Sequence, residues 1–214
     1  MMILSFLLFF LMFYVLDDIM VETFEWEGVY FLIHFLHNLM ISFWTFPNVV
    51  RVLTSNEKDC DIVPFVIPMV YGLHAYHIVA YMEYMRLDDW IHHIVSMGIA
   101  VPLTIFYFTN LNILGMCFFF TTGIPGGLNY FNLFLLKNWT GYDKRVQQKI
   151  NVFLQSWVRC PGIIMTCGFI LQNIFSNPQQ STFKIWMGLL ITSILFWNGV
   201  YFQNLVLFHS VKTT

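Results

Sequence analysis

The sequence predicts an all-α fold, a polytopic membrane helical bundle of about seven transmembrane helices. Three observations lead to this prediction: 58% of the 214 residues are apolar, only 10% are charged, and the apolar residues are gathered into long stretches. A soluble domain carries about 25% charged residues because its surface faces water. Most of this chain is therefore expected to face hydrocarbon, which a helix of about 20 apolar residues can cross.

Seven apolar segments follow one another along the chain with short connections. They span residues 2–16, 28–46, 62–82, 89–108, 111–136, 149–175 and 183–208. Each is expected to cross as a helix, because unpaired backbone groups are costly in hydrocarbon. The first segment has neither a basic leader nor a small-residue cleavage site, so we expect an uncleaved anchor rather than a signal peptide. We divide the chain into an N-terminal membrane anchor with an acidic loop, 1–27, and a transmembrane domain, 28–210.

Charge and cysteine content exclude two classes of protein. Ten Lys and Arg nearly balance twelve Asp and Glu, which leaves no basic field to attract nucleic acid. The four cysteines are scattered without a CxxC pair, so neither a disulfide framework nor a structural zinc site is indicated.

Basic residues favour one set of connections. Six Lys and Arg follow the first, third, fifth and seventh segments, and three lie in the opposite set. This bias predicts an outside N terminus and a cytoplasmic C terminus. The glycosylation sequon Asn138-Trp139-Thr140 would then lie on the cytoplasmic side and stay unmodified.

Two segments contain helix breakers at mid-membrane depth. In the fifth, Pro125 and Gly126 belong to the stretch TTGIPGG, which is either a packing kink or a gap lining a lipid or substrate cavity. The freed carbonyls need a partner there, such as a threonine or a cavity water. In the sixth, Arg159 precedes Cys160-Pro161-Gly162. We expect Arg159 to face the bundle interior or to snorkel, because a cation is costly in hydrocarbon.

Six of the seven histidines form three close pairs inside apolar segments: His34 with His37, His74 with His77, and His92 with His93. A spacing of three residues places both members of each of the first two pairs on one helix face. Imidazole is costly in hydrocarbon without a partner, so these histidines are functional candidates.

Three explanations of the histidines stay open. One is a metal centre like the histidine boxes of di-iron membrane desaturases and hydroxylases, although those boxes usually supply more histidines. Another is acid–base chemistry by His92 or His93. The third is a set of hydrogen-bonded helix contacts without chemistry, which we favour for His34, His37 and His74.

The residues around the last pair form a longer pattern: a Gly-Tyr-type helix, an acidic turn, two adjacent histidines, and an asparagine followed by a glycine. Here the pattern is carried by Tyr71-Gly72, Leu87-Asp88-Asp89-Trp90, His92-His93, Asn110 and Gly115. It resembles the TLC domain family, which includes ceramide synthases and translocating-chain-associated proteins, over about residues 28–210. Asn198-Gly199-Val200-Tyr201-Phe202 in the last segment is a weaker echo.

The resemblance implies a six-helix TLC-like core, preceded by the N-terminal segment, around a lipid-sized cavity in a membrane of the endoplasmic reticulum. In ceramide synthases the histidine pair belongs to the acyl-transfer site, so His92 and His93 are the candidate catalytic residues. The candidates for lining the lipid cavity are His74, His77, Asp88, Asp89, Asn110, Pro125, Gly126, Asn129 and Arg159.

The chain also departs from the family. The helix that carries acidic side chains in ceramide synthases is uncharged here over residues 123–130, and His77 stands where an aspartate is usual. A catalytic histidine needs an acceptor that fixes its tautomer. Asp88 and Asp89 lie four residues before His92 and His93 and could serve, but we favour a role as helix caps.

Three functions follow from these residues. The leading one is a TLC-type membrane protein that binds, senses or moves a lipid in an intramembrane cavity. The first alternative is a sphingoid-base N-acyltransferase with acyl-CoA as co-substrate, and the second is a histidine-box di-iron lipid hydroxylase or desaturase. Outside those alternatives we expect no cofactor and no metal. Membrane lipids are the expected partners, and a homo-oligomer is left open.

Overall fold

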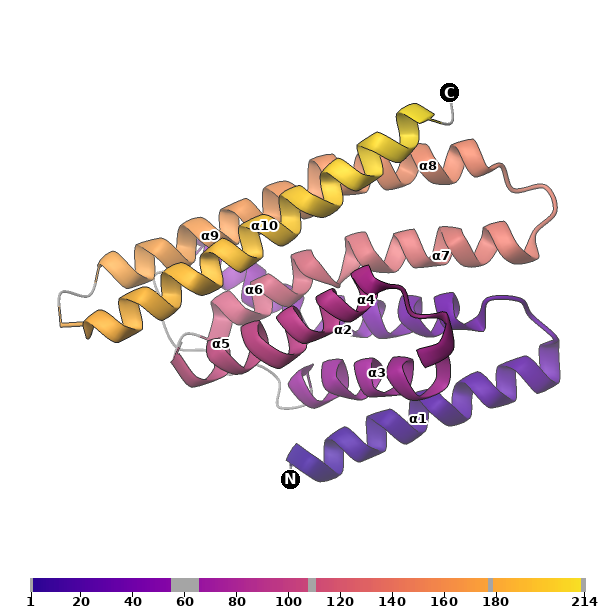
Figure 1. The fold of residues 1–214 in the computed structure, drawn as a ribbon, viewed down its shortest axis with the longest axis horizontal. Helices are drawn as coiled ribbons and strands as arrows, with labels where there is room; N and C mark the ends of the chain where they lie inside the picture. Colours follow the sequence, from indigo (N-terminus) through magenta and orange to yellow (C-terminus); the bar gives the residue numbers. More distant parts are fainter. Residues whose placement is uncertain (1, 55–65, 108–110, 177–178, 213–214) are drawn as a thin grey trace.

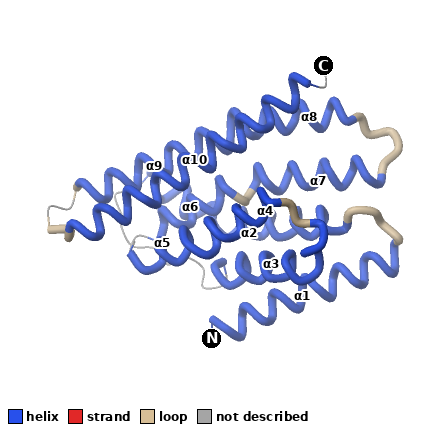
Figure 2. The backbone as a smooth tube through the Cα atoms, in the orientation of Figure 1, coloured by secondary structure: helices blue, strands red, loops and turns tan. Residues whose placement is uncertain are grey.

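The computed structural model describes residues 2–54, 66–107, 111–176 and 179–212. Over these ranges the chain is helical with short connections (Figures 1 and 2), which confirms the predicted all-α class. The first helices are α1 (Met2–Phe24), α2 (Val29–Thr54), α3 (Val66–Tyr81), η1 (Met82–Tyr84), α4 (Leu87–His92), η2 (His93–Ala100) and α5 (Val101–Tyr107). They are followed by α6 (Leu111–Thr121), α7 (Ile124–Asn138), α8 (Lys144–Phe153), η3 (Leu154–Arg159), α9 (Cys160–Phe175) and α10 (Thr182–Lys212).

These helices form seven legs that match the seven predicted segments. α4, η2 and α5 follow without interruption, as do α8, η3 and α9, whereas α6 and α7 are separated at residues 122–123. Four described helices are long and apolar enough to cross a membrane: Met2–Phe24, Val29–Thr54, Lys144–Phe175 and Thr182–Ser210. The other three legs are shorter or contain a break or a change of helix type.

The first leg is longer than predicted, and the acidic stretch after residue 16 is not a loop. α1 continues to Phe24. The Tyr81 hydroxyl at the end of α3 donates to the carboxylate of Asp17, at 2.9 Å to Oδ1 and 3.1 Å to Oδ2. α1 therefore packs along α3 beyond its apolar part, because a polar partner at that level stabilises the added turns.

The second leg also runs past its predicted end at residue 46. Pro47 lies inside α2, which continues to Thr54. Proline removes one backbone donor and usually ends a helix. Here the next residue, Asn48, is buried and its Nδ2 donates to Asn112 Oδ1 of α6 at 2.9 Å, so a contact between helices holds the turns after the proline.

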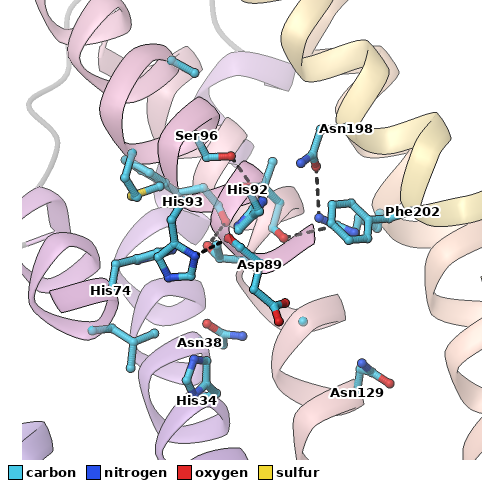
Figure 3. Close-up of a pocket in the computed structure, with 18 of the residues that line it drawn as sticks. His34, Asn38, His74, Asp89, His92, His93, Ser96, Asn129, Asn198 and Phe202 are labelled. Carbon is cyan, nitrogen blue, oxygen red and sulfur yellow. Dashed lines mark hydrogen bonds between the residues drawn. The ribbon is translucent and has the colours of Figure 1, made fainter. Parts of the chain in front are cut away.

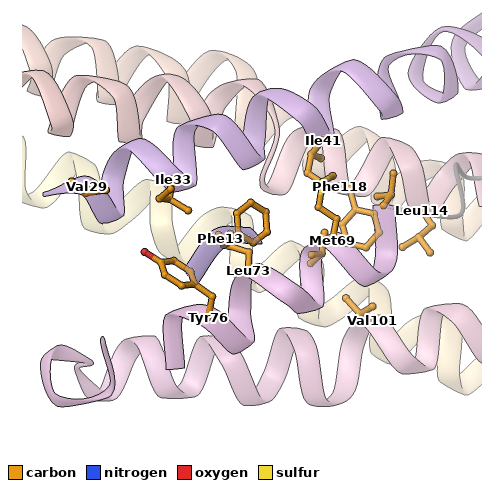
Figure 4. Close-up of a cluster of buried hydrophobic side chains, with 12 residues drawn as sticks. Phe13, Val29, Ile33, Ile41, Met69, Leu73, Tyr76, Val101, Leu114 and Phe118 are labelled. Carbon is orange, nitrogen blue, oxygen red and sulfur yellow. The ribbon is translucent and has the colours of Figure 1, made fainter. Parts of the chain in front are cut away.

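The largest apolar core lies between α1, α2 and α3 and extends to α5 and α6 (Figure 4). Phe13 of α1, Ile33 of α2 and Tyr76 of α3 are almost fully buried there. The opposite side of α1 exposes large apolar side chains such as Leu4 and Leu8. A continuous exposed apolar face of this kind is expected of a surface that another apolar phase covers.

Small residues allow α2 to approach α6 and α7 closely. A Cβ added at Gly115 would lie 2.6 Å from Asn48 Cγ, and one at Gly126 would lie 2.9 Å from Asn38 Nδ2. Such contacts between glycines and neighbouring helices are typical of membrane helix packing. They bring the polar side chains of α2 against the break between α6 and α7, where the candidate site lies.

Candidate functional site

A cavity of about 310 Å³ lies among the helices α2, α3, α4, α6, α7 and α10 and the π-helical segments η2 and η3 (Figure 3). Its volume is at the lower end of the roughly 300–1,000 Å³ of small-molecule sites. All three histidine pairs line it: His34, His37, His74, His77, His92 and His93. Helices from distant parts of the sequence thus bring six imidazoles to one space.

The histidine cluster is centred on His93. Its ring centroid lies 4.9 Å from that of His74 and 4.9 Å from that of His77. His34 extends the cluster, 5.5 Å from His77, and His92 lies 5.9 Å from His93. The sequence favoured simple packing roles for His34 and His37, yet the structure places both at the same cavity as the candidate catalytic pair. His74, for which packing was favoured but which was also a candidate for lining the cavity, lies there as well.

Backbone carbonyls orient three of these rings. Nδ1 of His34, His74 and His93 lies 2.8, 2.7 and 2.7 Å from the carbonyl oxygen four residues earlier. A carbonyl only accepts, so Nδ1 carries the hydrogen in each ring. In the neutral imidazole Nε2 then keeps its lone pair, and each ring is held in the tautomer whose Nε2 can accept.

Two of the buried ring nitrogens have no hydrogen-bond partner in the described part of the chain. They are Nε2 of His37 and Nε2 of His93, in side chains that are 0% and 7% exposed. A buried polar atom without a partner is rare and needs an explanation. Because both histidines line the cavity, a ligand donor is the explanation that the location favours.

Among the described residues, no group of three or more His, Cys, Asp or Glu side chains is arranged to hold a metal ion. His92 differs from the three rings that backbone carbonyls orient, since its Nδ1 lies 3.3 Å from a side-chain atom, Ser96 Oγ. The di-iron alternative stays a prediction that metal analysis of the purified protein tests.

Two π-helical segments supply residues to the cavity walls. η2 contributes His93 and Ser96, and η3 contributes Gln155 and Arg159. π-helical turns are rare and are frequent at functional sites, because the wider turn redirects side chains. These π-helical segments were not predicted from the sequence.

A sequence signal for both π-helical segments exists in the prolines that follow. Pro102 comes two residues after the end of η2, and Pro161 two residues after the end of η3. A proline has no N–H to donate to the carbonyl four residues earlier. In each case that carbonyl lies inside the π-helical segment and already lacks its usual α-helical donor. The backbone can therefore change from the α-helical to the π-helical hydrogen-bond pattern there without losing a further bond.

Arg159 faces the interior, as predicted, and is 8% exposed. Its Nε donates to the carbonyl of Thr121 at 3.2 Å, Nη1 to Gln155 Oε1 at 3.3 Å and Nη2 to Asn198 Oδ1 at 3.1 Å. The guanidinium carbon lies 4.9 Å from the ring centroid of Phe202. Thr121 ends α6, so the carbonyl freed by the break between α6 and α7 receives a charged donor.

The acidic turn serves mainly as a helix start. Asp89 Oδ2 accepts from the backbone N–H of Arg86 at 3.0 Å and lies 3.7 Å from Arg86 Nε. The Tyr201 hydroxyl donates to Asp88 at 3.4 Å. His93 bonds the backbone carbonyl of Asp89, not its carboxylate. The capping role favoured from sequence is therefore what the contacts of Asp89 show, although Asp88 and Asp89 also line the cavity.

The other predicted site residues divide into three groups. Gly126 and Asn129 line the cavity, and Asn129 Oδ1 accepts from Gln147 Nε2 at 3.3 Å. Pro125 is buried in the first turn of α7 and is not part of the lining. Asn110 lies outside the described residues.

Several lining residues were not predicted as site residues: Tyr30, Asn38, Ser96, Tyr130, Gln155, Asn198 and Phe202. Two of them, Asn198 and Phe202, belong to the last-segment echo of the TLC pattern, which was a usable signal. Tyr30 and Tyr130 lie against His34, with ring centroids 4.0 and 4.7 Å away. Tyr30 is four residues before His34 on α2, a spacing that periodicity reveals, whereas the contact of Tyr130 joins α2 to α7 and cannot be read from periodicity.

Polar and apolar side chains are separated along the cavity. On the leg from α4 to α5, His93 comes before Met97 and Val101, which also line the cavity. α10 runs in the opposite direction (Figure 1) and there Leu195 comes before Asn198. The two helices run in opposite directions and carry their polar and apolar lining residues in opposite order. Their apolar lining residues therefore lie at the same end of the cavity.

α6 follows the same arrangement. Leu114 and Phe118 precede Thr121 along α6, which runs roughly in the direction of α10 (Figure 1). The division is not complete, because Leu205 and Val206 of α10 are apolar lining residues beyond Asn198 and Thr104 of α5 is a polar lining residue beyond Val101. The cavity thus has a polar end around the histidines and Arg159 and an apolar end toward α5 and the start of α6.

Comparison of the chain with protein-family models, with curated proteins and with solved structures gives no match.

Proposed function

We propose that all seven legs cross a membrane and that the chain binds an amphiphilic lipid in the internal cavity. The four long apolar helices and the exposed apolar face of α1 support the membrane location. The other three legs are α3, the leg from α4 to α5 and the leg from α6 to α7. They lie alongside the four long helices and are apolar like them, so they cross as well, because unpaired backbone groups are too costly for a leg to end inside hydrocarbon. The endoplasmic reticulum and the TLC family remain the predictions of the sequence resemblance.

The observation that carries the lipid proposal is the division of the cavity into a polar and an apolar end. A lipid has the same division, with a head that needs hydrogen-bond partners and a tail that needs none. The histidines at the polar end supply hydrogen-bonding groups for the head, and Met97, Val101 and Leu114 supply an apolar surface for the tail. Pockets with a mostly apolar wall and a few placed polar groups are typical ligand sites.

Lipid retention tests this proposal. The protein is purified in a mild detergent, and bound lipid is measured by native mass spectrometry and by extraction. We expect a stoichiometric lipid in the wild type. Ala100→Phe, which fills the apolar end, should lower retention about tenfold, the effect of roughly 1.4 kcal/mol.

Ile99→Phe is the matched control, because Ile99 is the preceding residue, is 41% exposed and does not line the cavity. The lipid proposal is wrong if the wild type retains no lipid above the detergent background. It is also wrong if Ala100→Phe and Ile99→Phe retain the same amount.

Acyl transfer is a second candidate, and one observation favours it. His93 Nδ1 is held by the Asp89 carbonyl, so its Nε2 can accept a proton inside the cavity. In this reaction a long-chain amine attacks the thioester carbonyl of an acyl-CoA and forms the amide. His93 takes the amine proton, and the CoA thiolate leaves and is protonated.

CoA release in the presence of acyl-CoA and a long-chain base measures this activity, and mass spectrometry identifies the amide. His93→Ala should lower the rate at least about a hundredfold, the usual scale of a general base. His209→Ala is the control, since this seventh histidine is exposed and lies outside the cavity. Absence of CoA release over a range of acyl chains would exclude the acyltransferase candidate and leave the lipid-binding proposal intact.

A further inference from the structure

Arg159 is a cation at the middle of the leg Lys144–Phe175, and its bonded acceptors are all neutral. They are the Thr121 carbonyl, Gln155 Oε1 and Asn198 Oδ1. A guanidinium has five N–H donors, so two of them, one on each terminal nitrogen, have no hydrogen-bond partner in the described part of the chain. Buried charges are normally paired with an opposite charge.

The nearest acidic candidates have other partners. Asp89 is held by the backbone N–H and the Nε of Arg86, and Asp88 accepts from the Tyr201 hydroxyl. Over residues 2–54, 66–107, 111–176 and 179–212, the ion pair found is Arg86 with Asp89. The charge of Arg159 is therefore not neutralised by a carboxylate of the described chain.

The position of Arg159 is fixed on several sides. The Phe202 ring covers one face of the guanidinium at 4.9 Å. The three neutral acceptors come from α6, from α10 and from η3, the segment of Arg159 itself, so two other helices and the preceding turn hold the group at the cavity wall. Figure 3 shows Asn198 and Phe202 of α10 on this side of the cavity. A preorganised guanidinium with donors to spare matches the oxygen atoms of a carboxylate or phosphate.

We infer that the amphiphile bound in the cavity carries an anionic head, a carboxylate or a phosphate monoester, that pairs with Arg159. This inference rests on the proposed lipid binding and names the chemical class of the lipid. The tail of the amphiphile extends toward Met97, Val101 and Leu114, at the apolar end. When the head also carries a hydroxyl, as the glycerol of a lysophosphatidate does, that hydroxyl donates to a neutral imidazole nitrogen of the histidine cluster.

Binding of four single-chain amphiphiles of equal chain length to the full-length protein in lipid nanodiscs tests the inference. The four are a fatty acid, its methyl ester, a lysophosphatidate and a long-chain primary amine. Affinity is measured by displacement of a fluorescent fatty-acid probe. We expect the acid or the lysophosphatidate to bind at least about tenfold more tightly than the ester, and the stronger of the two identifies the anion.

Arg159→Gln should remove the preference for the anion, so that the acid and the ester bind this variant with affinities within about twofold of each other. Arg145→Gln is the matched control, because Arg145 is exposed near the start of the same leg. Arg159→Lys keeps the charge and should keep part of the preference. If Arg159→Gln does not fold, the comparison of acid with ester on the wild type still decides the question.

The outcomes separate this inference from the proposed function. Equal binding of acid, lysophosphatidate and ester by the wild type overturns the anion inference, while lipid binding stands. Tighter binding of the amine than of the anions also overturns it and assigns the head to Asp88 and Asp89. No binding of any of the four amphiphiles overturns both the inference and the lipid proposal.

Discussion

Buried hydroxyl and amide side chains are satisfied in two different ways. The hydroxyls of Thr45, Thr166 and Thr192 donate to the backbone carbonyl four residues earlier in their own helix. Such bonds form within one helix, so they need no neighbouring helix and can form in any apolar helix. Asn48 and Asn112 instead bond each other across α2 and α6. Only the second kind of bond specifies which helices pack together.

The bond between Asn48 and Asn112 should show as a coupling energy. In a double-mutant cycle of Asn48→Ala and Asn112→Ala, we expect about 0.6–1.7 kcal/mol of coupling, the range measured for hydrogen bonds between membrane helices. Unfolding of the purified variants in mixed micelles measures the free energies. As a control, Thr45→Ala should show no coupling with Asn112→Ala, because the Thr45 hydroxyl bonds its own helix. A cycle that closes to zero for the asparagines contradicts the prediction.

Interruptions determine the shape of the site at the scale of the helix. The break between α6 and α7 exposes the Thr121 carbonyl to Arg159, and the π-helical segments η2 and η3 turn His93 and Arg159 into the cavity. Gly123 stands at the break, where an added Cβ would lie 2.4 Å from the Phe119 carbonyl oxygen. A backbone oxygen cannot move aside as a flexible side chain does, so glycine is required there.

Gly123→Ala should destabilise the protein by about 1–3 kcal/mol, the usual cost of overpacking. In a chain of this size that loss lowers the unfolding midpoint by roughly 2–4 °C per kcal/mol. Gly168→Ala is the matched control, because a Cβ at this exposed position in α9 meets nothing within 4 Å. That variant should be neutral or stabilised by up to about 1 kcal/mol. Thermal unfolding in detergent measures both, and equal midpoints would contradict the account of the break.

At the scale of the whole molecule, the chain alternates between two ends of the bundle. The connections from α1 to α2 and from α7 to α8, and the C terminus, lie toward one end, and the turn from α9 to α10 lies at the other (Figure 1). Asn138 ties two connections of the first end together, since its Nδ2 donates to the Glu27 carbonyl at 2.7 Å. The amide of the predicted sequon is thus engaged, which is an independent reason to expect it unmodified.

Accessibility of single cysteines tests the proposed crossing of seven legs. Tyr84→Cys and Gly141→Cys should be labelled by an impermeant maleimide from the same side of sealed vesicles, and Gln179→Cys from the opposite side. All three positions are exposed, and the background carries Cys60→Ser because the other cysteines are at least partly buried. The basic-residue bias predicts that positions 84 and 141 face the cytoplasm. Labelling of Gly141→Cys and Gln179→Cys from one side would contradict a crossing by α8, η3 and α9.

The sequence by itself determined the helical class and the position of the seven legs, because apolar length is a local property that a bilayer would demand of every crossing segment. It also identified some of the polar residues that line the cavity, His93 and Arg159 among them, because such a residue is costly in any apolar segment and thus conspicuous. The ends of the legs were less predictable. α1 and α2 extend past their apolar stretches because Tyr81 and Asn112 on other helices hold the added turns.

Only the tertiary structure decided that the three histidine pairs meet. The pairs lie on α2, on α3 and at the junction of α4 with η2, up to 59 positions apart in sequence from His34 to His93. No periodicity within one helix reports which faces of three helices converge. The same holds for Arg159, whose neutral partners come from three elements. A local sequence shows which polar groups need a partner, and the packing of the helices decides whether that partner is another side chain or a bound molecule.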